Sequence, residues 1–156
     1  MINLHQKSDW HRTIRRYLVF ATTANLVWEF LHLPLYTIWQ EETLPKNVYA
    51  AIHCTAGDLI IAVCALMLSL LIFGNQDWPK SGFSRVLTST VILGLAYTIF
   101  SEWLNIEIRK SWAYSELMPV VPILETGLSP IAQWIVLPIS GLNWAANNRK
   151  LDILSN

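Results

Sequence analysis

The chain has 156 residues, of which 53% are hydrophobic and 14% charged, and its 11 Lys and Arg balance its 11 Asp and Glu. A net charge of zero gives no electrostatic reason to expect a nucleic-acid partner. Because the apolar residues gather into runs of about 20, the composition argues against an ordinary soluble domain and predicts an all-α integral membrane protein.

Three apolar segments are predicted to cross the membrane as helices in the first two thirds of the chain. They cover residues 17–39, 47–74 and 85–108. At about 1.5 Å per residue, each is long enough for a hydrocarbon core about 30 Å thick. The sequence therefore predicts three spans joined by short loops.

A fourth span is predicted near the C-terminus. The apolar chain from 117 to 144 holds four prolines, which disfavour one straight helix. Ser129 is a good N-cap and Pro130 suits the first helical position, so the span is expected at 130–147. Residues 109–128 then form a Pro-broken, partly embedded loop that caps the outer side of a four-helix bundle.

Lys and Arg are divided unevenly between the two ends of these spans. Eight lie in the N-terminal segment, the second loop and the C-terminal tail, and three lie on the opposite side. The positive-inside rule therefore predicts that both termini are cytoplasmic. We expect one transmembrane domain, residues 1–156, in a bacterial inner membrane.

Ionisable residues interrupt the first and second spans. Glu29 and His32 share one helix face because they are three residues apart. Such residues are costly in hydrocarbon and usually face a polar interior. His53 and Asp58 lie about 140° apart on an ideal helix, so both face inward only if Gly57 marks a π-bulge or if they serve different neighbours.

The third span adds Glu102, and counting about 1.5 Å per residue places all these groups in the outer half to the middle of the bilayer. We therefore expect one cavity formed by Glu29, His32, His53 and Glu102, with Asp58 deeper or beside it. Supporting hydrogen bonds are expected from Asn25, Tyr97 and Asn105. Gln133 in the fourth span is interpreted either as a residue that joins helices or as a substrate contact.

The ligand chemistry favours one divalent metal ion, zinc or iron. His32 and His53 are the predicted nitrogen ligands, and Glu29 and Glu102 the predicted oxygen ligands. Glu-x-x-His is half of the pattern used by di-iron carboxylate bundles, and the second half is missing, which favours a single ion or an unusual pair. With Glu29, Glu102 and Asp58 as catalytic carboxylates, this predicts a metal-dependent intramembrane enzyme that acts on a membrane lipid or another lipid-soluble small molecule.

Three alternatives stay open. One is a metal-free lipid isomerase or hydrolase, in which Glu29 and His32 exchange a proton. Another is an ion- or proton-coupled transporter, although the inner halves of the second and third spans hold no carboxylate or histidine that would continue a path. The last is an accessory subunit of a larger membrane complex or a homo-oligomer, whose polar stripes would dock on other helices.

Overall fold

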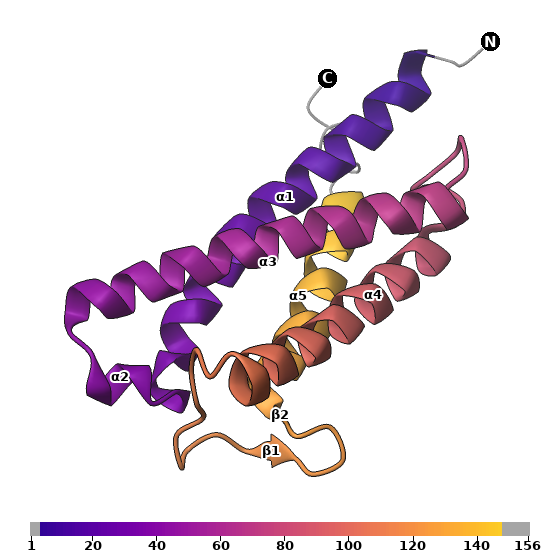
Figure 1. Ribbon diagram of the computed structural model, residues 1–156. Helices are drawn as coiled ribbons and strands as arrows, with labels where there is room; N and C mark the ends of the chain where they lie inside the picture. Colours follow the sequence, from indigo (N-terminus) through magenta and orange to yellow (C-terminus); the bar gives the residue numbers. More distant parts are fainter. Residues whose placement is uncertain (1–3, 148–156) are drawn as a thin grey trace.

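The computed structural model describes residues 4–147 and is mostly helical (Figure 1). Its four long helices are α1 (Leu4–His32), α3 (Leu44–Phe73), α4 (Phe83–Trp103) and α5 (Leu128–Asn147). Helix α1 packs against α3 and α5, and α4 packs against the same two helices. The start of α1 and the end of α5 lie at one end of the molecule, opposite α2 and the strands.

Three helical segments in the described part of the chain are long and apolar enough to cross a membrane. They are Asp9–Leu35, Leu44–Phe73 and Phe83–Ile108. Three of the four predicted spans therefore meet this criterion of length and composition. Helix α5 has 20 residues and contains Pro138, and it is not among the three.

The first span differs from its predicted limits at its C-terminal end. Helix α1 ends at His32, and the 3₁₀ helix η1 (Leu33–Leu35) and the short helix α2 (Ile38–Glu41) follow. Pro34 explains the break, because it has no backbone N–H to continue the α-helical hydrogen bonds. The predicted segment 17–39 therefore contains three helical pieces, and His32 stands at the junction of the first two.

The π-bulge considered at Gly57 is wrong, because α3 is α-helical throughout. A π-helical segment, η2 (Leu104–Ile108), extends α4 instead. The wider turn therefore lies next to Glu102 rather than next to Asp58.

The connection between α4 and α5 is largely irregular. It contains a small antiparallel pair of strands, β1 (Val120–Val121) and β2 (Thr126–Gly127). Tyr114 forms an isolated bridge with Tyr36, and backbone hydrogen bonds of 2.9 and 3.0 Å lie on either side of that bridge. These contacts hold the connection against the segment that follows α1.

The helices pack most tightly toward the loop between α3 and α4. Leu66, Ser69 and Val86 are almost completely buried there. Farther along α4, the ring of Trp134 lies so close to Gly94 that a Cβ atom would overlap it. From the closely packed end, α3 and α4 diverge toward α2 (Figure 1). This divergence makes room for a cavity between the helices.

Candidate functional site

One cavity of about 390 Å³ lies where α3 and α4 diverge. Side chains from α1, α3, α4, α5 and the connection after α4 line it. The ionisable residues singled out in the three spans are all on this lining: Glu29, His32, His53, Asp58 and Glu102. The residues predicted from the sequence therefore line one cavity, but they differ in how deeply they are buried.

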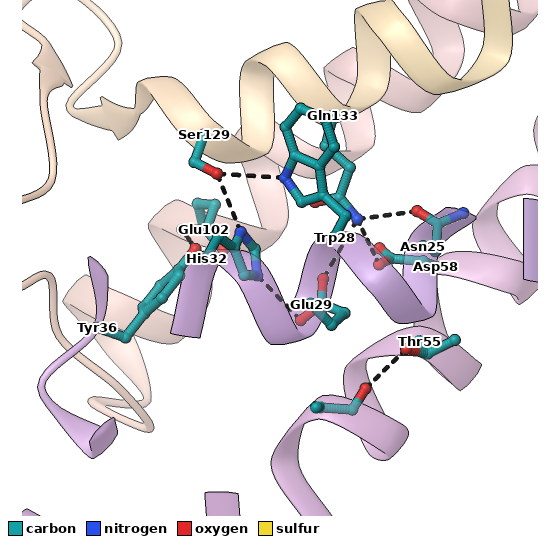
Figure 2. A network of polar contacts seen from close by, with 11 residues as sticks. Asn25, Trp28, Glu29, His32, Tyr36, Thr55, Asp58, Glu102, Ser129 and Gln133 are labelled. Carbon is teal, nitrogen blue, oxygen red and sulfur yellow. Dashed lines mark hydrogen bonds and ion pairs between the residues drawn. The ribbon is translucent and has the colours of Figure 1, made fainter. Parts of the chain in front are cut away.

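Glu29 and His32 form the buried centre of the site (Figure 2). His32 Nε2 lies 3.0 Å from Glu29 Oε2, and His32 Nδ1 lies 3.1 Å from Ser129 Oγ. The Trp28 indole N–H donates to the same Ser129 oxygen over 3.2 Å. Because the indole can only donate, the hydroxyl hydrogen is available for Nδ1, which favours the tautomer with a proton on Nε2, facing Glu29.

Gln133 on α5 connects to α1 and α3 through its side-chain amide, next to the Glu29–His32 pair. Its Nε2 lies 2.8 Å from Asn25 Oδ1, 2.9 Å from Asp58 Oδ2 and 3.2 Å from Glu29 Oε1 (Figure 2). The carboxyl groups of Glu29 and Asp58 therefore share the amide of Gln133 as a common donor. The amide nitrogen has two hydrogens for three acceptors, so this cluster has more acceptor atoms than the amide can satisfy.

Glu102 is held from outside α4. Its Oε2 accepts hydrogen bonds from the hydroxyls of Tyr36, at 3.3 Å, and Tyr114. The Tyr114 oxygen also accepts the backbone N–H of Gly127 over 2.8 Å. Burial raises the pKa of both phenols, and the nearby Glu102 carboxylate raises it further. Both tyrosines therefore remain protonated donors at neutral pH.

The supporting residues differ from those predicted. Asn105 and Tyr97 line the cavity, but the Asn105 amide donates to the Ser101 carbonyl over 2.8 Å, and Tyr97 is 51% exposed. The carboxylate of α4 is held by the two tyrosines instead. Asn25 contacts the site through Gln133.

The predicted metal ligands lie around the cavity without forming a compact set. His53 is exposed, and its ring stacks on that of Tyr49 with the centroids 5.8 Å apart. Both nitrogens of His32 already have protein partners. Within residues 4–147, no three His, Cys, Asp or Glu side chains are grouped so that they could hold a metal ion. An ion bound here would require His32 or His53 to move.

Two functional contacts had no signal in the sequence. Tyr114 lies in an irregular segment without periodicity, and Ser129 was interpreted only as a helix cap. Gln133 did carry a signal, because an amide inside an apolar helix is costly unless it is paired.

No family model matches the chain, and no characterised protein or solved structure is significantly similar to it. The cavity and its side chains are therefore the features of this protein that indicate a function.

Proposed function

We propose that this protein is a four-span integral membrane protein that binds a lipid-soluble molecule and performs metal-free acid–base chemistry on it. One observation carries the proposal: the buried Glu29–His32 pair, 3.0 Å apart, lines a cavity of about 390 Å³ between apolar helices. Glu29 and His32 handle the proton, and Asp58 and Glu102 are the further carboxyl groups that face the substrate.

The hydrogen bonds of the His32 imidazole suit proton transfer. The Ser129 hydroxyl can donate to Nδ1 of a neutral ring or accept from Nδ1 of a protonated ring, so both charge states keep a partner. The contact with Glu29 lets a proton pass between the carboxylate and the imidazole. A site of this kind removes a proton at one substrate position and returns one at another. That is what the isomerisation of a double bond needs, and it consumes no co-reactant.

The membrane placement extends to α5. At about 1.5 Å per residue, its 20 residues reach about 30 Å, which matches the hydrocarbon core. Helix α5 packs against α1 and α4, as a fourth span would. The cationic residues that set the orientation include Arg149 and Lys150, which lie outside the described residues. In this arrangement both termini are cytoplasmic, and the connection after α4 covers the outer side.

Cysteine labelling tests the orientation. In a background in which both native cysteines, Cys54 and Cys64, are replaced by serine, Glu41→Cys should react with an impermeant maleimide added outside intact cells. Gln76→Cys, in the loop at the other end of α3, should react only after permeabilisation. The opposite pattern would invert the topology.

Lipid extracts test the chemistry. Membranes from cells that express the protein should contain a lipid whose chromatographic retention changes without a change in mass, as an isomerisation requires. Expression of Glu29→Gln should leave the unconverted lipid, whereas Glu42→Gln, a carboxylate that pairs with Lys46 at the surface, should behave as the unaltered protein. The proposal fails if the unaltered protein and an empty vector give the same extract, or if Glu29→Gln is fully active.

A metal-dependent enzyme is the second candidate, because His32, His53, Glu29 and Glu102 line the same cavity. Zinc or iron would be held by these residues after a rearrangement of the two imidazoles. Elemental analysis of the protein purified in mild detergent should then show one metal ion per chain, absent from His32→Ala. That variant should still insert, since insertion depends on the apolar spans. Substoichiometric metal in the unaltered protein would eliminate this candidate.

A further inference from the structure

We infer that the cavity opens sideways into the lipid between α3 and α4 and takes a lipophilic amine, with its apolar body in this opening and its ammonium group on the carboxylates. The inference deepens the proposed function by naming the class of molecule bound, and it rests on the same cavity. It does not depend on the reaction that follows binding.

The position of the opening follows from residues that are exposed on the outside of the helices and also line the cavity. Ile60 on α3 is 65% exposed, and Tyr97 on α4 is 51% exposed. His53 and Gly57 are also exposed cavity-lining residues on α3. Both helices are candidate membrane spans, so their outer faces meet lipid. We call this opening the lateral window, formed by His53, Gly57, Ile60 and Tyr97.

Gly57 keeps the lateral window wide. A Cβ atom built at this position meets no atom of the described chain within 4 Å. A glycine in the middle of a helix weakens the helix by about 0.5–1 kcal/mol relative to alanine. Gly57 therefore leaves open space at a position where a larger side chain would fit without a clash and would narrow the entrance.

The charge of the cavity indicates the head group of the ligand. Glu29, Asp58 and Glu102 face it, and Arg109 is the one Lys or Arg side chain among the described residues that line it. Arg109 is exposed, beyond the end of η2. Three carboxyl groups against one peripheral guanidinium leave a surplus of acidic groups and hydrogen-bond acceptors. An ammonium group, which only donates, complements such a surplus.

Two atoms are left without protein partners in this region. Both tyrosine hydroxyls donate to Oε2 of Glu102, so Oε1 accepts no hydrogen bond from the described residues. Thr98 is 6% exposed, lines the same cavity, and its Oγ1 has no partner within residues 4–147. Buried polar atoms are normally paired, so the unpaired Thr98 Oγ1 favours a ligand that donates hydrogen bonds, and Glu102 Oε1 is a second acceptor for it. Glu102 and Thr98 are one helical turn apart on α4, so one head group can reach both.

Three probes with the same chain and different head groups test the ligand class: oleylamine, oleyl alcohol and oleic acid. Binding to the purified full chain in mild detergent is measured by native mass spectrometry at neutral pH. The amine should bind at least about tenfold more tightly than the acid, with the alcohol between them. Glu102→Gln should reduce the preference for the amine over the alcohol. Equal or tighter binding of oleic acid would overturn the assignment.

Gly57→Leu tests the lateral window and should weaken oleylamine binding by about tenfold or more. Ala56→Leu, at the exposed neighbouring position of α3, is the matched control and should bind as the unaltered protein. Leucine is a better helix former than glycine and meets no clash at position 57, so lost binding would not reflect misfolding. Unaltered thermal unfolding of both variants would verify this. Full binding by Gly57→Leu would refute the lateral window.

These measurements separate the inference from the proposed chemistry. Glu29→Gln should abolish lipid conversion but only reduce the preference for the amine, because Glu102 and Asp58 remain. If the amine preference and the Gly57 effect hold but no lipid is converted, the chemistry fails and the binding site stands. If lipid is converted but the probes show no preference, the ligand assignment alone fails.

Discussion

Replacing Gln133 by leucine tests whether the polar cluster stabilises the helix bundle. Leucine is close to glutamine in size, so Gln133→Leu removes the amide without leaving a large void. The amide has two hydrogens, so the substitution removes two hydrogen bonds that are shared among acceptors on Asn25, Asp58 and Glu29. Interhelical hydrogen bonds in membranes contribute about 0.6 kcal/mol on average and at most about 1.7 kcal/mol. We therefore expect the free energy of unfolding to fall by about 1–3 kcal/mol.

Thermal unfolding in detergent, followed by the monomer peak in size-exclusion chromatography, measures this loss. For a chain of this size, about 1 kcal/mol shifts the unfolding midpoint by about 2–4 °C, so the expected decrease is roughly 2–12 °C. Asn143→Leu is the matched control, because Asn143 is an amide of the same helix whose one hydrogen bond among the described residues goes to the Ile139 carbonyl, at 2.8 Å. Its effect should stay within about 0.5 kcal/mol.

The outcome that contradicts this reasoning is equal stability of the two variants. Gln133 would then be a substrate contact whose hydrogen bonds are exchanged for solvent or lipid without loss. A decrease for Gln133→Leu alone would show that the amide joins α5 to α1 and α3.

Two further substitutions probe the packing and the connection. Gly94→Ala should destabilise the protein by about 1–3 kcal/mol, because its methyl group would overlap the buried Trp134 ring. Gly57→Ala is the control and should be neutral or stabilising. Equal thermal unfolding midpoints for the two variants would refute the close approach of α4 and α5. Tyr114→Phe removes one hydrogen bond to Glu102 and one from Gly127, so amide exchange in residues 111–127 should accelerate while exchange in α3 is unchanged. Unaltered exchange at Gly127 would show that the phenol does not hold the connection in place.

The candidate spans were predictable because length and apolar composition are local properties of the sequence. The end of α1 is not visible in the hydropathy, because the apolar run continues past Pro34, but the missing N–H of Pro34 is itself a local sequence signal for a break there. The π-helical segment Leu104–Ile108 was missed for a related reason. A π-helical turn holds one residue more than an α-helical turn, so it changes the direction of the side chains that follow while the apolar composition of the segment stays the same.

Pairs within one helix were also predictable. Glu29 and His32 meet because positions three apart share a helix face, whatever surrounds them. Their outside partners follow from how α5 approaches α1, and nothing in the residues near Ser129 specifies that its hydroxyl meets His32. For His53, the sequence allowed an estimate of its depth in the membrane. It did not indicate that the ring stacks on Tyr49 or that the residue lies at the exposed edge of the cavity.

The irregular connection after α4 and the cavity form one unit. Tyr114 joins the two, because its oxygen accepts the Gly127 N–H while its hydroxyl hydrogen goes to Glu102, which lines the cavity. The same phenol thus pairs one backbone group of the connection and one carboxylate oxygen of Glu102. Displacing the connection would leave that oxygen with Tyr36 as its one donor among the described residues.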